Sequence, residues 1–245
     1  MKNKVIAIIP ARYESLRFPK KLLYKINGKS ILEHTYLNAK KCASLDDIYI
    51  ATDSKIIFDM VKKFNAKCLM TSVECKNGTD RIIEAIENYE LLNEANIIVN
   101  VQGDHPKIEP ETIDLSIKAL LNDESAIAST AVTKINYSIA KNENVVKCVF
   151  DCQNNALYFS RSLIPHSKNF EKINYYYHIG LYVYKKDFLL KLKKLKETKC
   201  QLLEDLEQLK ILENGYKMKV AIVNDIPLSV DVFEDIKKVE KILCQ

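Results

Sequence analysis

The sequence predicts an α/β fold: a Rossmann-like, mostly parallel central sheet with helices on both faces and an inserted antiparallel hairpin region. Short apolar runs rich in β-branched residues alternate with amphipathic stretches over the first half, as in strand–helix–strand units. The middle of the chain then changes to strands that follow one another directly. Without repeats, low-complexity tracts or linkers, we expect one domain over 1–245, with an antiparallel substrate or dimer subregion at about 130–185.

The first strand is predicted at 5–9, a short and continuous apolar run. Pro10 is expected to end it, because proline cannot donate to a sheet ladder. The loop that follows carries four cations: Arg12, Arg17, Lys20 and Lys21. Ligands of open α/β sheets bind at the carboxyl ends of strands, so this loop predicts an anion site, with a polyphosphate as the obvious ligand.

The other elements of the first half follow in order. Ser30 and Glu33 form a capping box that opens a helix reaching about Cys42. Apolar periodicity then predicts strands at 48–51, 67–71 and 96–101, and helices at 56–64, around Ile82 to Ile86, and at 111–121.

The second half begins with a predicted hairpin, in which strands 146–150 and 156–161 flank a polar turn. A third strand is expected at 177–184, followed by helices at 185–196 and 202–214, a strand at 217–223 and a terminal helix after Asp231. A single helix over 202–214 would place Glu204, Glu207 and Gln208 on one face. Its buried side would then be formed by five leucines: Leu202, Leu203, Leu206, Leu209 and Leu212.

Composition narrows the classes of function. The net charge of +5, from 37 basic and 32 acidic residues, is mild and gives no reason to expect a nucleic-acid partner. Seven scattered cysteines without a C-x-x-C pair indicate reduced thiols in a cytoplasmic protein rather than a disulfide framework or a zinc site. No apolar stretch approaches the length of a membrane span, so we expect no membrane insertion.

Two aspartates are candidates for a metal site. Asp104 follows a predicted buried strand and Gly103, so its carboxylate should emerge at the sheet edge, where magnesium uses one or two carboxylates with phosphate oxygens. Capping of the turn before Pro106 explains Asp104 equally well. Asp231 taken alone is better explained as the N-cap of the last helix.

Other polar residues allow both a functional and a structural interpretation. The turn from Asn77 to Arg81 places backbone amides and a guanidinium at a helix N-terminus, which suits an anion but is a common arrangement. Arg161 could hold a carboxylate with its two-pronged guanidinium, or could form a surface ion pair. His178 stands on a predicted strand, where a lone histidine is more often structural than catalytic.

Together these motifs resemble one family, the CMP-Kdo synthetases, which are cytidylyltransferases for 3-deoxy-manno-octulosonate (Kdo). The similar segments occur in the order and spacing of the family from residue 4 to the C-terminus. They are Ile9-Pro10-Ala11-Arg12-Tyr13, Ala51-Thr52-Asp53, Gly78-Thr79-Asp80-Arg81, Asn100-Val101-Gln102-Gly103-Asp104, Ala156-Leu157-Tyr158-Phe159-Ser160-Arg161, His178-Ile179-Gly180-Leu181-Tyr182, Leu206-Glu207-Gln208-Leu209 and Val230-Asp231.

The resemblance implies a nucleotide-diphospho-sugar transferase-like fold and transfer of CMP from CTP to the anomeric hydroxyl of Kdo, with release of pyrophosphate. It implies CTP binding by Arg12, Lys21, Arg81 and Gln102, with Asn77 and Arg17 as further contacts. Asp104 and Asp231 would hold Mg²⁺, and the eight-carbon sugar acid would be oriented by Arg161, His178, Glu207 and Gln208. A cytoplasmic homodimer that supplies lipopolysaccharide biosynthesis is also implied.

Departures from the family pattern keep alternatives open. Lys20 stands where a glycine is usual, and Asn77 replaces a serine. His105 and Gln201 differ from the acidic or amide residues expected at their positions, and they leave the choice of sugar unsettled. The alternatives are cytidylyl transfer to 8-amino-Kdo or another 2-keto-3-deoxy sugar acid, and a non-catalytic nucleotide-binding descendant.

Overall fold

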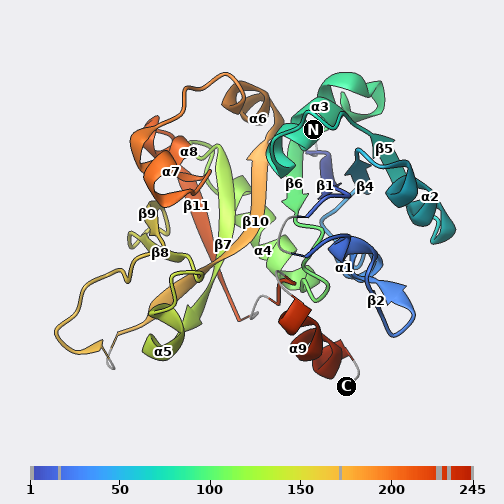
Figure 1. Cartoon of the computed structure of the whole chain (residues 1–245). Helices are drawn as coiled ribbons and strands as arrows, with labels where there is room; N and C mark the ends of the chain where they lie inside the picture. Colours follow the sequence, from blue (N-terminus) through green and yellow to red (C-terminus); the bar gives the residue numbers. More distant parts are fainter. Residues whose placement is uncertain (1–2, 16–17, 171–172, 225–227, 231–232, 244–245) are drawn as a thin grey trace. The chain divides into compact units, whose positions relative to one another are not determined.

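The computed structural model describes residues 3–15, 18–170, 173–224, 228–230 and 233–243 (Figure 1). The chain groups into two compact units: a first unit of residues 1–114 and 227–245, and a second unit of residues 115–226. Compact units of this kind occur within single domains as well as between domains, so the single domain over 1–245 stays a prediction.

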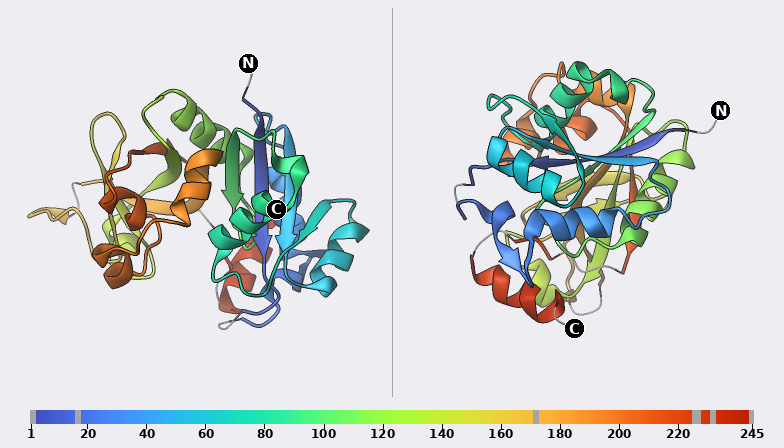
Figure 2. Two further views of the ribbon diagram at one scale, coloured as in Figure 1. Left: turned by 90° about the horizontal axis from the view of Figure 1, so that it is seen from above. Right: turned by 90° about the vertical axis from the view of Figure 1, so that its right-hand side faces the viewer.

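The first unit contains a parallel sheet in the order β6–β1–β4–β5. Its strands are β1 (Val5–Ala11), β4 (Asp47–Thr52), β5 (Lys67–Met70) and β6 (Ile97–Val101). β1 and β6 are buried along their whole length, as their continuous apolar runs predict. β1, in dark blue, pairs on one side with β4 and on the other with β6 (Figures 1 and 2).

The connections of this sheet are the helices α1 (Ile31–Ala39), α2 (Lys55–Lys63) and α3 (Gly78–Asn88). The chain steps from β1 to β4 to β5 in one direction and then returns to β6 beyond β1. Right-handed crossovers therefore place α1 and α2 on one face of the sheet and α3 on the other. The strand order reverses between β1 and β6, and ligands of such sheets bind at this point. The predicted α/β class with helices on both faces is confirmed.

Smaller elements complete the first unit. They are η1 (Lys21–Leu23), β2 (Lys25–Ile26), β3 (Lys29–Ser30), η2 (Glu90–Leu92) and α9 (Phe233–Leu243). The predicted capping box is present in part, since the Ser30 hydroxyl accepts the Glu33 amide at the start of α1. α4 (Pro110–Leu121) leads from the first unit into the second.

One boundary prediction in this unit is wrong: Pro10 lies within β1, which continues to Ala11. β1 remains paired with β4 at Pro10, whereas its pairing with β6 stops at Ile8. A proline beyond the last paired residue on that side removes no ladder hydrogen bond, so the strand tolerates it.

The second unit is built on the strands β7 (Ala128–Ile135), β8 (Lys147–Phe150), β9 (Ala156–Ser160), β10 (Tyr175–Lys185) and β11 (Met218–Val223). β10 runs antiparallel to β7 and contacts β8, β8 and β9 form the predicted hairpin, and β11 runs parallel to β7. The antiparallel region is thus confirmed, although the sequence analysis did not predict β7. The helices here are α5 (Tyr137–Ala140), α6 (Lys186–Leu192), α7 (Lys199–Glu204) and α8 (Leu209–Glu213).

The predicted single helix over 202–214 is wrong. It is divided at Asp205, whose φ of 52° is left-handed and ends α7, and α8 begins only at Leu209. Leu202 and Leu203, expected on the buried side, are 61% and 75% exposed. Glu204 therefore does not share a helical face with Glu207 and Gln208. No helix within the described ranges is long and apolar enough to cross a membrane.

Candidate active site

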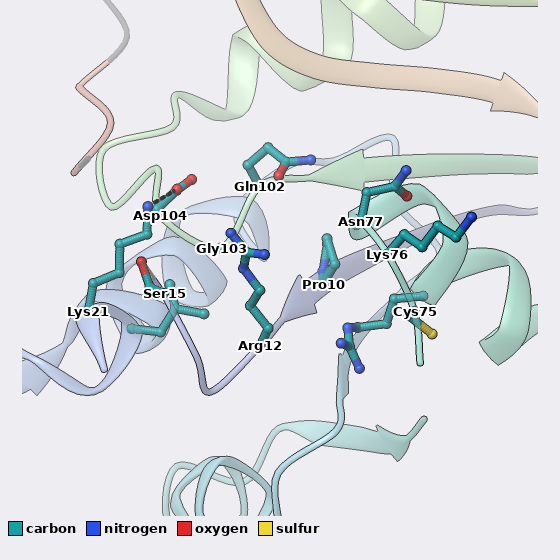
Figure 3. A pocket seen from close by; sticks show the side chains of 13 residues that line it. Pro10, Arg12, Ser15, Lys21, Cys75, Lys76, Asn77, Gln102, Gly103 and Asp104 are labelled. Carbon is teal, nitrogen blue, oxygen red and sulfur yellow. Dashed lines mark hydrogen bonds and ion pairs between the residues drawn. The ribbon is translucent and has the colours of Figure 1, made fainter. Parts of the chain in front are cut away.

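A cavity of about 310 Å³ lies in the first unit at the carboxyl ends of β1 and β6. Three segments line it: the end of β1 with its loop, the start of α3, and the turn after β6 (Figure 3). The lining residues are Pro10, Arg12, Ser15, Lys21, Leu22, Cys75, Lys76, Asn77, Gly78, Arg81, Gln102, Gly103 and Asp104. Six residues predicted to act on the nucleotide or metal thus line one cavity, at the reversal of strand order.

Two lining cations are available to a ligand. Arg12 and Lys76 are exposed, and neither forms a salt bridge within the described part of the chain. Lys76 was not singled out from the sequence, although it directly precedes the turn that was. Two cations that pair with no described carboxylate, beside the N-terminus of α3, make the cavity suitable for a multiply charged anion.

Lys21 and Asp104 form an ion pair across the cavity wall, with Nζ 2.5 Å from Oδ2 (Figure 3). The same Nζ donates to the Val230 carbonyl at 2.8 Å. Burial acts to raise the pKa of the Asp104 carboxyl, but Lys21 and His105 outweigh it, so this pKa lies below its usual value. Asp104 is therefore ionised at neutral pH, as a metal ligand requires.

Arg81 lines the cavity, but most of its guanidinium is used within the protein. Nη2 donates to Asp53 Oδ2 at 2.6 Å, and Nη1 donates to the Thr71 hydroxyl at 2.6 Å and the Ser72 carbonyl at 3.3 Å. Asp53 Oδ1 also accepts the backbone amide of Tyr13 at 3.3 Å. Asp53, which was named from the sequence only within the segment Ala51-Thr52-Asp53, thus ties α3 to the loop that carries Arg12.

The start of α3 and the turn after β6 meet at Pro10 through two glycines. A Cβ on Gly78 would lie 3.0 Å from Pro10 Cγ, and one on Gly103 would lie 3.1 Å from the Pro10 carbonyl oxygen. Asn77 caps α3 by accepting the Asp80 amide at 2.7 Å. A side chain at either glycine would be crowded against Pro10, so the two glycines favour the close approach of these three segments.

Gln102 presents an amide to the same cavity. Its Nε2 donates to the buried Asn100 Oδ1 at 2.8 Å, which fixes the orientation of the amide group. The second N–H and the carbonyl oxygen of that amide can form hydrogen bonds with a ligand, as the predicted contact to a nucleotide requires.

The predicted sugar-binding residues Arg161, His178, Glu207 and Gln208 all belong to the second unit. His178 is buried, with Nε2 2.9 Å from the Thr130 hydroxyl and Nδ1 3.5 Å from Gln208 Nε2. The Tyr182 hydroxyl donates to Gln208 Oε1 at 3.1 Å, and burial, followed by the nearby negative charge of Glu207, raises the Tyr182 pKa. Thr130, His178, Gln208 and Tyr182 therefore form one polar network, in which the first three side chains are buried.

Arg161 is held by the end of α7. Its backbone N–H donates to Glu204 Oε2 at 2.9 Å, and its Nε donates to the Glu204 carbonyl at 2.9 Å. The surface ion pair considered from the sequence is weak, since Nη2 lies 4.0 Å from Asp205 Oδ2, a carboxylate that is 97% exposed.

The predicted residues Arg17 and Asp231 lie outside the described residues. Of the positions that depart from the family pattern, Lys20 has a φ of 58°, a left-handed conformation that glycine adopts without strain. Gln201 accepts the Thr198 amide at 3.2 Å at the start of α7, and His105 Nε2 lies 3.9 Å from Asp104 Oδ1. Among the residues that the structure describes, no group of three or more His, Cys, Asp or Glu side chains could hold a metal by itself.

Comparisons with known proteins show what the whole chain is similar to. A family model described as cytidylyltransferase matches residues 6–226. A protein of Protochlamydia amoebophila (strain UWE25) named 3-deoxy-manno-octulosonate cytidylyltransferase is 49% identical, and the match covers 100% of this chain and 96% of that protein. A mitochondrial protein of the same name from Arabidopsis thaliana is 43% identical, over 99% of this chain and 84% of that protein.

The chain is also similar to solved structures. A structure of CMP:2-keto-3-deoxy-manno-octonic acid synthetase complexed with CTP matches with a TM-score of 0.94 at 33% identity, covering 99% of both chains. A 4-diphosphocytidyl-2C-methyl-D-erythritol synthase from Anaerococcus prevotii DSM 20548 matches with a TM-score of 0.65 at 19% identity, which shows a shared fold alone.

Proposed function

The chain belongs to the cytidylyltransferase family, and on this premise we propose that it transfers CMP from CTP to the anomeric hydroxyl of Kdo. The products are CMP-Kdo, used for lipopolysaccharide biosynthesis, and pyrophosphate. The observation that carries the proposal is the cavity at the reversal of strand order, where Arg12, Lys21, Gln102 and Asp104 meet. The proteins to which the chain is similar over its full length carry the same activity in their names.

We assign the triphosphate of CTP to the cationic part of this cavity. Arg12 and Lys76 supply positive charge that no carboxylate of the described residues neutralises. Lys21, fixed by Asp104 and the Val230 carbonyl, adds a donor of defined position. Gln102, with Asn77 at the start of α3, is assigned to the base and ribose, and Arg81 supports the site through Asp53.

The donor set also fits Mg²⁺. Asp104 is ionised, and its Oδ1 lies 3.9 Å from the His105 ring nitrogen Nε2. Mg²⁺ is commonly held by one or two carboxylates together with phosphate oxygens, so a cluster of three protein ligands is not needed. We propose that Asp104, with Asp231 as a second ligand, holds the ion, which when bound supplies positive charge to the phosphate oxygens.

The protein side of the reaction is positioning and charge neutralisation. The anomeric oxygen forms a bond to the α-phosphorus, the bond to pyrophosphate breaks, and the hydroxyl proton is released. Arg12 and Lys21 hold the departing phosphates, while Arg161, His178, Glu207 and Gln208 are assigned to orienting the sugar acid. Orientation and fixed positive charge supply most of the acceleration in phosphoryl-type transfers.

We further propose that the protein acts in the cytoplasm as a homodimer. The six cysteines of the described residues are free thiols, which suits a reducing compartment. Three large hydrophobic residues of the second unit, Leu157, Leu202 and Leu203, are at least 59% exposed, and an interface with a second copy would cover such side chains.

A pyrophosphate-release assay tests the proposed function. The protein is incubated with CTP and Mg²⁺, and with Kdo, 8-amino-Kdo or a nine-carbon sialic-type acid in separate reactions. We expect release with Kdo that stops when Mg²⁺ is chelated. Release with 8-amino-Kdo alone would show that the sugar substrate is 8-amino-Kdo and not Kdo. No release with any acid would favour a protein that binds the nucleotide without turnover.

A further inference from the structure

We infer that Glu204 is a positioning residue that sets the guanidinium of Arg161 for the carboxylate of the sugar acid. The inference rests on the proposed function, because it assumes that Arg161 binds that carboxylate. From the sequence, Glu204 was predicted only to share one helical face with Glu207 and Gln208. In the structure it stands at the end of α7 and faces the end of β9.

Glu204 contacts the β9 end with both its carboxylate and its carbonyl. Oε1 accepts the Ser160 hydroxyl at 2.6 Å, and Oε2 accepts the Arg161 amide at 2.9 Å. The Glu204 carbonyl accepts Arg161 Nε at 2.9 Å, and the next carbonyl, that of Asp205, accepts Nη2 at 3.4 Å. One residue therefore fixes both the backbone and the side chain of Arg161.

A buried lysine holds the other side of the Arg161 backbone. Lys147 is fully buried, and its Nζ donates to the Arg161 carbonyl at 2.5 Å and to the carbonyls of Asn142 and Val145. The Arg161 N–H thus bonds to an anion and its C=O to a cation. Charge-assisted hydrogen bonds of this kind are stronger than neutral ones, so the backbone of Arg161 is held in one place.

The contacts leave the end of the guanidinium available. Nε and Nη2 face the two carbonyls of α7, while Nη1 has no hydrogen bond to any described residue. The Nη1–Nη2 edge is one of the two edges with which arginine binds a carboxylate through parallel hydrogen bonds. Arg161 is therefore fixed along one edge and open along the other.

The left-handed Asp205 makes this arrangement possible. A helix continued through 202–214 would use the carbonyls of Glu204 and Asp205 in its own ladder. Because α7 ends at Asp205, both carbonyls are free to accept the guanidinium. The break in the helix therefore helps to orient Arg161.

Glu204→Gln tests the inference, with Glu213→Gln as the matched control. Glu213 is also a carboxylate that accepts α7 groups, the amides of Cys200 and Gln201, but it has no contact with 160–161. The amide in Glu204→Gln turns one acceptor into a donor that opposes the Ser160 hydroxyl or the Arg161 amide. We expect KM for Kdo to rise about tenfold or more, with KM for CTP changed less than about twofold.

A double-mutant cycle separates positioning from general destabilisation. Once Arg161→Ala removes the guanidinium, adding Glu204→Gln should raise KM for Kdo little further, whereas Glu213→Gln should leave it near the wild-type value. Equal rises in both KM values, or additive effects of Glu204→Gln and Arg161→Ala, would overturn the inference while the wild type remains active. A wild type without turnover on any sugar acid would instead overturn the proposed function and this inference together.

Discussion

At the scale of single residues, Asp104 is central to the account. Asp104→Asn removes the negative charge that pairs with Lys21 and that we assign to Mg²⁺. We expect turnover to fall by several orders of magnitude, because the charge that stabilises the reacting phosphate groups would be lost. The control is Asp59→Asn, an exposed aspartate paired with Lys55 on α2, which should leave turnover unchanged. Near-normal turnover of Asp104→Asn would refute the metal assignment.

Cys75 gives a pH-dependent prediction at the cavity. Burial, the hydrogen bond to Glu84 and the charge of that carboxylate raise the Cys75 pKa to about 12. The neutral thiol is favoured in the fold, so at pH 8 only a very small fraction of the molecules carries the reactive thiolate. A disulfide reagent should therefore label Cys75 far more slowly than the exposed Cys152, and peptide mass spectrometry distinguishes the two.

The sign of this effect can be checked in two ways. Because the pKa of Cys75 is raised in the folded protein, labelling should accelerate about tenfold per pH unit above pH 8. In the unfolded chain the Cys75 thiol ionises at lower pH, near its ordinary pKa of 9.0. Folding stability contributed by this thiol is thus lost as pH rises past 9. Glu84→Gln should lower the pKa and speed labelling; labelling of Cys75 as fast as that of Cys152 would contradict the assignment.

Three of the six predicted residues that line the cavity share one property. Arg12, Gln102 and Asp104 follow parallel strands, and the carboxyl ends of such strands meet at one edge, so topology alone brings them together. Asp53 also follows a parallel strand, β4, but neither its role nor that of Lys76 could be assigned in the same way. Their roles depend on a buried pairing with Arg81 and on the path of the loop before α3, which no local pattern encodes.

At the scale of elements, the N-cap of α3 can be tested by substitution. Asn77→Ala removes the side-chain acceptor of the Asp80 amide and should lower the free energy of unfolding by about 1 kcal/mol. Asn77→Ser keeps an acceptor and should lie within a few tenths of a kcal/mol of the wild type. Urea denaturation measures both values. Equal losses in the two variants would show that the cap is not the source of the effect.

Other elements show where sequence patterns suffice and where they fail. Strands of the first unit were predicted within about two residues, because fully buried parallel strands are continuous apolar runs. The helix over 202–214 was predicted on leucine spacing alone. The left-handed Asp205 breaks it, and its carbonyl accepts Arg161 from a strand more than forty residues earlier in the chain. Local spacing carries no information on such a contact.

At the scale of the whole molecule, the proposed homodimer has a direct readout. Light scattering on the eluted protein should give about twice the chain mass of 28.2 kDa. Leu203→Glu, which places a charge on an exposed leucine of α7, should shift the mass toward that of one chain if this surface is the interface. A single-chain mass for the wild type would refute the homodimer.

The central claim is that the chain joins CMP to the anomeric oxygen of Kdo. Phosphorus NMR of a reaction containing CTP, Kdo and Mg²⁺ tests it most directly, because it observes both products. We predict that one phosphodiester resonance, from CMP-Kdo, and the resonance of pyrophosphate appear in equal amounts as the three CTP resonances disappear. Persistence of the CTP resonances, or formation of free CMP without a sugar phosphodiester, would contradict the account.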